Sequence, residues 1–196
     1  KLAEDYTVIV PDLRGYGDSA KPESDPAHEA YSFRAMAKDQ VAVMRALGYD
    51  RFALVGHDRG GRVSHRLTLD HPDAVSRLCV LDIIPTRTLY QTADQRIATG
   101  YYHWYFLIQP FDFPERMIGA DPEWYIRGRT EKFASPEAVA EYLRCFSDPA
   151  CIHATCEDYR AGASIDLLHD ETDLDHKIEC PFLVLWGEKG LMGRAY

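Results

Sequence analysis

The sequence predicts an α/β fold built around a mostly parallel sheet. Short apolar runs, such as Phe52 to Val55 and Leu78 to Leu81, alternate with amphipathic helical segments in the first 89 residues. Apolar runs of this kind are typical of strands that are buried on both faces of a parallel sheet. Right-handed β-α-β connections should then bring the carboxyl ends of the strands to one edge of the sheet, where active sites form.

Three segments of different character follow one another along the chain. Residues 1–89 are expected to form a partial α/β core, residues 90–179 a helical cap inserted between two strands, and residues 180–196 a partial return to the core. The cap segment contains no convincing strand, whereas Tyr101 to Phe106 is rich in aromatic residues and Pro136 to Phe146 has a helical pattern. The return strand is expected at Phe182 to Gly187.

The first fifty residues predict one helix end, one strand, one loop and one complete helix. Lys1 to Asp5 has the character of the last turn of a helix, and Tyr6 to Val10 is expected to be a buried parallel strand. The Gly-rich polar segment Asp12 to Ser19 then resembles the loops at the carboxyl ends of strands. A helix follows with Ser32 as its N-cap, apolar residues at three- and four-residue spacing, and Gly48 as its end.

A strand, a sharp turn and a helix meet in the stretch Leu54 to Arg62. The turn carries two glycines four residues apart, Gly56 and Gly60, and glycine permits the tight backbone that would hold the central side chain, Asp58, above the sheet edge. The next strand delivers Asp82 at its carboxyl end. We therefore expect the two carboxylates to come from adjacent strand ends and to face one crevice.

The chemistry expected of Asp58 is attack on carbon. A carboxylate nucleophile forms an alkyl ester, so the substrate should carry an electrophilic sp³ carbon, bearing a halide or belonging to an epoxide, more readily than a carboxylic ester. Arg59 and Arg62 lie on the first turn of the following helix, where they would keep Asp58 ionised and could hold a substrate carboxylate. The alternative is that both arginines only pair with surface acids.

Composition limits the partners and the compartment. The chain has 196 residues with a net charge of −9 and no run of Lys or Arg, so nucleic acid and an anionic membrane are not expected as partners. It has no apolar run long enough to span a bilayer, and its first residues are not expected to be a signal peptide. Five scattered cysteines without a Cys-x-x-Cys pair favour reduced thiols in the cytoplasm over disulfides or zinc.

Several segments together resemble one group of enzymes. They are Pro11 to Gly17, Gly56 to Arg62, Leu81 to Thr86, Tyr102 to Trp104, Cys156 to Gly162 and Leu185 to Gly187. In these segments the sequence resembles the fluoroacetate dehalogenases, which act on haloacetates and have the α/β-hydrolase fold. The Gly-Asp elbow alone is shared with epoxide hydrolases and haloalkane dehalogenases, whereas the pair Arg59 and Arg62 is much more specific to the haloacetate enzymes.

The resemblance implies a role for each candidate residue. Asp58 would be the nucleophile, Asp82 the acid that orients a histidine, Arg59 and Arg62 the clamp for the substrate carboxylate, and His103, Trp104 and Tyr159 the hydrogen-bond donors to the departing halide. It also implies a homodimer and the absence of a metal or organic cofactor.

Taken alone, some of these residues have simpler explanations. The Tyr-His-Trp run could be packing in an aromatic helix, Tyr159 an ordinary tyrosine, and Asp82 a turn-capping residue.

Three family features are missing from the sequence. The later strand is followed by Gly190 where many members have an acid, which makes Asp82 the better candidate for the acid. A Gly-His segment with the catalytic histidine and a His-Gly-Phe-Pro segment are both absent, and His57 should point away from the site. We therefore expect the 196 residues to be the middle of a longer protein, truncated at both ends, and expect these residues alone to be alkylated without turning over.

The sequence thus predicts hydrolytic dehalogenation of a short 2-haloacid, fluoroacetate or chloroacetate, to the hydroxyacid. Two alternatives stay open. An epoxide hydrolase would need two cap tyrosines aimed at the epoxide oxygen and leaves Arg59 without a purpose. The second alternative is a non-catalytic protein that binds a small carboxylate, and only the missing histidine supports this interpretation.

Overall fold

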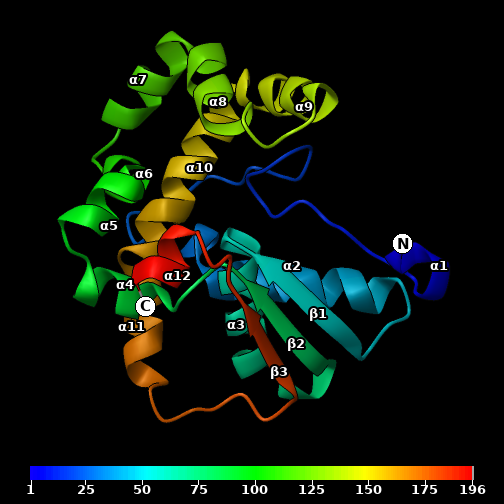
Figure 1. The fold of residues 1–196 in the computed structure, drawn as a ribbon. Coiled ribbons are helices and arrows are strands. Elements are labelled where there is room, and N and C mark those ends of the chain that lie inside the picture. Colours follow the sequence, from blue (N-terminus) through cyan, green and yellow to red (C-terminus); the bar gives the residue numbers. More distant parts are fainter. Residues whose placement is uncertain (196) are drawn as a thin grey trace.

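The computed structural model, which describes residues 1–195, has a three-stranded parallel sheet in the order β1-β2-β3 (Figure 1). The strands are β1 (Phe52–His57), β2 (Val75–Leu81) and β3 (Phe182–Leu185). Both neighbouring pairs are parallel, and Gly56 and Val80 are partners in the first of them. The predicted α/β fold with a parallel sheet is confirmed.

Helices make up most of the remaining described chain. Before the sheet lie α1 (Leu2–Asp5), the 3-10 turn η1 (Glu29–Tyr31) and α2 (Phe33–Ala46), and between β1 and β2 lie α3 (Arg59–Asp70) and the 3-10 turn η2 (Pro72–Ala74). Between β2 and β3 lie α4 (Thr86–Thr92), α5 (Gln95–Gly100), α6 (Tyr102–Phe106), α7 (Phe113–Ala120), α8 (Pro122–Thr130), α9 (Pro136–Phe146), α10 (Pro149–Gly162) and α11 (Ile165–Thr172), and α12 (Leu191–Ala195) follows β3.

The helix predicted after Ser32 begins and ends for the expected reasons. The Ser32 Oγ accepts a hydrogen bond of 3.1 Å from the Ala35 N–H and so satisfies one of the free N–H groups of the first turn of α2. Gly48 stands just beyond the last turn with a φ of 87°, a conformation that glycine adopts without strain. Local chemistry therefore sets both ends of α2.

The prediction of a strand at Tyr6 to Val10 is wrong. Within residues 1–195 this segment pairs with no strand, and the side chains of Tyr6, Val8 and Val10 are exposed. A strand needs a neighbour that completes its backbone hydrogen bonds, and the described chain offers none here. An apolar run predicts a strand only where such a neighbour exists.

One face of the sheet carries the main hydrophobic core. Helices α2 and α3 lie behind the sheet in Figure 1, and Leu67, Leu78 and Val80 are buried between these layers. The opposite face has no helix over it among the described residues, and Val55 and Leu183 on it are 63% and 52% exposed. The core that positions the elbow is therefore the one between the sheet and α3.

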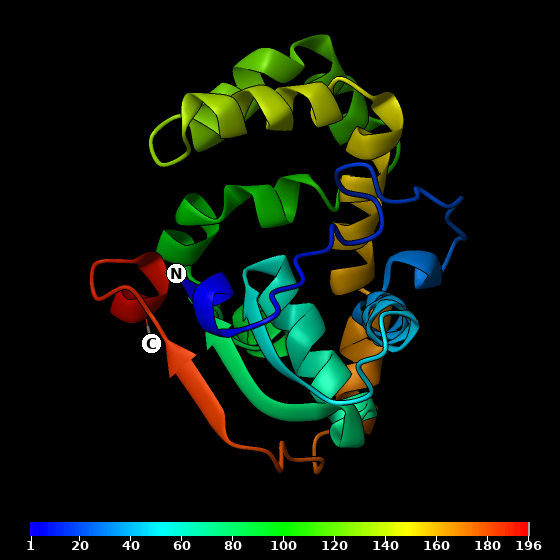
Figure 2. The ribbon, with the colours of Figure 1, turned by 90° about the vertical axis from the view of Figure 1, so that its right-hand side faces the viewer.

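The helices between β2 and β3 lie at different distances from the sheet. Helices α7, α8 and α9 stand far from the sheet at one end of α10, which runs from them down to the core (Figures 1 and 2). Ala154 and Ala161 of α10 belong to the core of the sheet, whereas Cys156 and Tyr159 belong to a second cluster around Trp104. Helix α10 thus joins the two hydrophobic clusters. In residues 1–195 no helix is both long and apolar enough to cross a membrane.

Candidate active site

Asp58 sits in a strained turn between β1 and α3. Its φ of 49° and ψ of −119° are a conformation that non-glycine residues rarely adopt. A Cβ atom on Gly56 would lie 2.4 Å from the carbonyl oxygen of Gly60, so only glycine allows the backbone to turn this tightly. The result is an exposed carboxylate directly beyond the carboxyl end of β1.

Asp58 and Asp82 follow paired residues of neighbouring strands. His57 and Leu81 are partners in the parallel ladder, so the next residues of β1 and β2 emerge at the same edge of the sheet. The Asp82 Oδ1 accepts a hydrogen bond of 3.3 Å from the Gly187 N–H beyond β3, and Asp82 also has a positive φ, 54°. In the described part of the chain no histidine is hydrogen-bonded to either carboxylate.

Arg59 is buried and paired, but not with a surface acid. Its Nε donates to Oδ2 of Asp158 at 2.8 Å, and its Nη2 donates to Asp158 Oδ1 and, at 2.8 Å, to the Asp158 carbonyl. Asp158 is fully buried on α10. The Nη1 of Arg59 is buried without a hydrogen-bond partner among the described residues. Pairing with surface acids, the alternative considered from the sequence, does not describe this residue.

Arg62 is also buried, but the described chain gives it no carboxylate partner. Its Nη1 donates to the Ile84 carbonyl at 3.1 Å, its Nε has no partner, and its guanidinium lies 4.5 Å from the centre of the Trp104 ring. Burial and the neighbouring charge of Arg59 lower the pKa of Arg62 to about 10, while the charge of Asp58 opposes this shift. Arg62 therefore remains a cation at neutral pH.

The three expected halide donors form one cluster of rings. The ring of Tyr159 lies 5.7 Å from that of His103 and 5.8 Å from that of Trp104, in edge-on arrangements. His103 and Trp104 come from α6 and Tyr159 from α10, so Tyr159 lies more than fifty positions from the other two in the sequence. The structure thus brings these three residues together and sets them against the two arginines.

Burial keeps the polar groups of this cluster in their neutral forms. It lowers the pKa of His103 to about 4, with a further contribution from Arg129, so the imidazole is neutral at pH 7. Burial and the negative charge of Asp58 raise the pKa of Tyr159, so its hydroxyl stays protonated and can donate a hydrogen bond. Both side chains are therefore uncharged groups able to donate an N–H or O–H.

Sequence reasoning missed two residues that hold this arrangement together. They are Asp158, which binds Arg59, and Tyr16, whose hydroxyl donates to Asp158 Oδ2 at 2.5 Å. Both lie in segments that carry the family resemblance, and Tyr16 lies in the Gly-rich loop that precedes η1 and α2. A buried charge partner on a distant helix leaves no periodic signal in the sequence.

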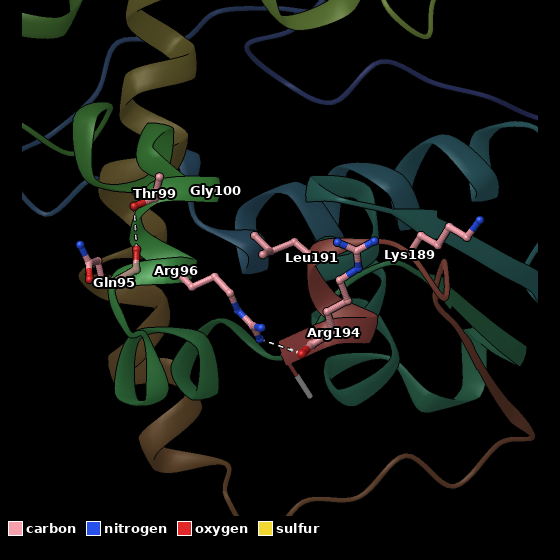
Figure 3. A pocket seen from close by; sticks show the side chains of 7 residues that line it. All are labelled: Gln95, Arg96, Thr99, Gly100, Lys189, Leu191 and Arg194. Atoms are coloured by element: carbon pink, nitrogen blue, oxygen red, sulfur yellow. Dashed lines mark hydrogen bonds between the residues drawn. The ribbon is translucent and has the colours of Figure 1, made fainter.

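Two other features of the molecule are not part of this arrangement. A surface hollow of about 580 Å³ between α5 and α12 is lined by residues that include Arg96, Lys189 and Arg194, and Arg96 donates to the Arg194 carbonyl at 2.7 Å (Figure 3). Glu115, His153 and Glu157 lie close enough to share a cation, but Arg160 already donates to both carboxylates at 2.6 and 2.7 Å. An arginine therefore occupies the place that a metal ion would need.

Comparison with known proteins agrees with the geometry. The family model described as alpha/beta hydrolase fold matches residues 1–194. A fluoroacetate dehalogenase from Burkholderia sp is 52% identical over 198 residues, a match that covers 97% of this chain and 65% of that protein. A soluble epoxide hydrolase from Corynebacterium sp. (strain C12) is 34% identical over 205 residues, with 98% of this chain and 68% of that protein covered.

Solved structures give the same picture of the fold. A structure from Nostoc sp PCC 7120, assigned to the α/β hydrolases, has a TM-score of 0.92 at 62% identity and covers 94% of this chain and 66% of that one. This chain thus spans about two thirds of the length of the proteins it matches. With its parallel sheet, its strained strand–turn–helix elbow and these similarities, the chain belongs to the α/β-hydrolase fold family.

Proposed function

We propose that the protein hydrolyses the carbon–halogen bond of a short 2-haloacid, fluoroacetate or chloroacetate, to give the 2-hydroxyacid. The observation that carries the proposal is Arg62, a guanidinium only 4% exposed that has no carboxylate partner in the described chain and lies beside the strained Asp58. A buried charge without a partner is costly, and binding an anionic substrate would offset that cost. The similarity to a fluoroacetate dehalogenase supports the same substrate class.

In this proposal the arginines hold the substrate carboxylate and Asp58 attacks the α-carbon. The free Nη1 of Arg59 and Nε of Arg62 are the donors available to that carboxylate, and their charge removes its repulsion by Asp58. A carboxylate oxygen of Asp58 forms a bond to carbon while the halide leaves with the bonding electrons. Water then attacks the carbonyl carbon of the resulting ester, which releases the hydroxyacid and restores Asp58. Asp82 is proposed to orient the histidine that activates this water.

The ring cluster supplies what the leaving halide needs. Fluoride concentrates its charge on one small atom, so fixed donors in a dry pocket stabilise charge that develops only in the transition state. His103, Trp104 and Tyr159 are proposed as those donors, since their rings contact one another and two of them have pKa values shifted toward the neutral, proton-donating form. Trp104 is almost completely buried, at 1% exposed.

The first experiment measures fluoride release from fluoroacetate by the intact protein, meaning the full-length protein that contains these 196 residues, and by its Asp58→Asn variant, with chloroacetate in parallel. We expect release by the unmodified protein only, and mass spectrometry of a rapidly quenched reaction should show a carboxymethyl ester on the peptide that contains Asp58. Release of chloride but not fluoride would keep the chemistry and reject the halide donors. Binding of fluoroacetate with no adduct and no halide would instead favour a carboxylate-binding protein.

A second candidate activity, epoxide hydrolysis, has one specific observation in its favour. Burial and the charges of Asp58 and Asp82 raise the pKa of Tyr101, and burial and the charge of Asp58 raise that of Tyr159. Two protonated tyrosine hydroxyls therefore interact electrostatically with Asp58, the proposed nucleophile. A relative at 34% identity is an epoxide hydrolase. Adding styrene oxide to the same assay separates the two activities, because opening of the epoxide without halide release would favour the second.

A further inference from the structure

We infer that Asp158 and Tyr16 are positioning residues for Arg59, holding its guanidinium so that only the Nη1 edge is left to bind the substrate carboxylate. The inference rests on the proposed function and names two residues that the sequence did not. It also gives the Gly-rich loop from Asp12 to Ser19 a purpose in the site.

The hydrogen bonds between Arg59 and Asp158 fix the guanidinium through its Nε and Nη2 atoms. Nε and Nη2 donate to the two carboxylate oxygens of Asp158, a bidentate pair, and Nη2 also donates to the Asp158 carbonyl. Three donors of the fork are thereby used within the protein. Nη1 is the nitrogen left without a partner, although it is fully buried.

Two aromatic rings pack against the Arg59 guanidinium and restrict its movement. The ring centroids of Phe33 and Tyr159 lie 4.6 and 4.4 Å from the central carbon of the Arg59 guanidinium. With the edge bound to Asp158 and these rings packed against it, the guanidinium has little freedom to rotate. The direction of Nη1 is therefore set before any substrate arrives, which is what fixed orientation for in-line attack requires.

Tyr16 is a second hydrogen-bond donor to the Asp158 carboxylate. Its hydroxyl donates to Oδ2, the same oxygen that accepts from the Arg59 Nε. Burial and the charge of Asp158 raise the pKa of Tyr16, so the hydroxyl keeps the proton that it donates. Asp158 is thus held by a residue of the Gly-rich loop as well as by its own helix.

The loop that carries Tyr16 is itself fixed by close contact with α10. A Cβ on Gly15 would lie 2.9 Å from the Cβ of Ala154, and a Cβ on Gly17 would lie 2.1 Å from a carboxylate oxygen of Asp12. Both glycines also have positive φ values, 88° and 53°. A continuous series of contacts therefore runs from the loop through Tyr16 and Asp158 to Arg59.

Arg62 has no such support, and the difference gives the two arginines distinct parts. Asp158 offsets the charge of Arg59, whereas Arg62 keeps its full positive charge and has only the Ile84 carbonyl as a hydrogen-bond acceptor. Arg62 would attract the substrate carboxylate, and Arg59 would orient it. Loss of Asp158 should then impair recognition of the carboxylate group more than the chemistry at carbon.

The test compares Tyr16→Phe and Asp158→Asn with a matched control, Tyr31→Phe, in the intact protein. Tyr31 is also a buried tyrosine against Gly15, but its hydroxyl donates to the Pro22 carbonyl at 2.7 Å and not to Asp158. Each variant is assayed with chloroacetate and with its neutral amide, chloroacetamide, by chloride release. A residue with a purely structural role would affect both substrates equally, so the ratio of the two rates is the informative quantity.

We expect kcat/KM for chloroacetate to fall roughly tenfold in Tyr16→Phe and up to about a hundredfold in Asp158→Asn, mainly through KM. The rate with chloroacetamide should change much less, and Tyr31→Phe should alter neither rate. Equal losses for both substrates, or an unchanged chloroacetate KM in a folded Tyr16→Phe, would overturn the inference alone. If Asp158→Asn does not fold, Tyr16→Phe decides the question. No halide release by the unmodified protein would overturn the proposed function, and this inference with it.

Discussion

At the scale of single residues, only one of the two glycines that flank Asp58 is required by its surroundings. A Cβ on Gly56 would lie 2.4 Å from a backbone oxygen, whereas a Cβ on Gly60 would meet no atom within 4 Å. We expect Gly56→Ala to lower the free energy of unfolding by about 3 kcal/mol or to prevent folding, because the backbone must move. Gly60→Ala, on the first turn of α3, should be neutral or stabilising by up to about 1 kcal/mol.

Urea unfolding followed by circular dichroism measures both variants. The pair controls for the loss of glycine itself, since the two positions lie in one turn and receive the same methyl group. Similar free energies of unfolding for the two variants would show that the close approach at Gly56 does not restrain the elbow.

The sequence predicted which candidate residues lie close together better than it predicted the bonds between them. Asp58 and Asp82 could be assigned to one edge because each follows an apolar strand, and the structure pairs the preceding residues, His57 and Leu81. The partner of Arg59 could not be found in this way, since Asp158 lies 99 positions away on a helix whose polar residues have no visible period. Roles of the site residues in catalysis stay predictions.

At the scale of elements, helix α3 concentrates basic side chains on the core side, and this makes stability depend on pH. Burial, followed by the charges of Arg66 and Arg62, lowers the pKa of His65 to about 4 from its ordinary value of 6.5. Between these two pH values the unfolded chain binds more protons than the folded one. The contribution of neutral His65 is therefore fully present above about pH 6.5 and is lost as the pH falls toward 4.

We expect His65→Gln to flatten this part of the stability curve. The free energy of unfolding of the unmodified protein should fall by roughly 2 to 3 kcal/mol more than that of the variant between pH 7 and pH 4. Urea unfolding at closely spaced pH values checks this, with the difference between the two curves as the measured quantity because other groups titrate in both. Parallel curves would show that folding does not change the pKa of His65.

Helix ends were predictable and strand partners were not. The region Pro136 to Phe146 was expected to be helical, and α9 has these bounds because Ser135 caps its first turn and Pro136 suits the first position. These are local effects that a short stretch of sequence contains. Tyr6 to Val10 has the composition of a strand, but strand formation depends on a neighbour elsewhere in the chain. That information is absent from the segment itself.

At the scale of the whole molecule, Arg160 links the remote helices to the core. It lies on α10 and donates to Glu115 of α7 at 2.6 Å and to Glu157 at 2.7 Å, and Arg160 and Glu157 are each only about 5% exposed. Glu157 in turn contacts His28 at 2.6 Å and so reaches the segment before α2. One buried cation thus joins three parts of the chain, and its removal would leave two carboxylates facing each other.

We expect Arg160→Met to lower the free energy of unfolding by roughly 3 to 5 kcal/mol and to loosen α7 before the sheet unfolds. The matched control is Arg144→Met, since Arg144 also binds two carboxylates, Glu141 and Asp18. All three side chains are exposed, so the loss of Arg144 should change stability much less than the loss of Arg160. Hydrogen exchange separates the cases: amides of α7 should exchange faster in Arg160→Met, while those of β1 and α3 keep their protection. Uniform loss of protection would show that the remote helices and the sheet unfold as one unit, and the network would then stabilise the whole molecule without specifically tethering α7.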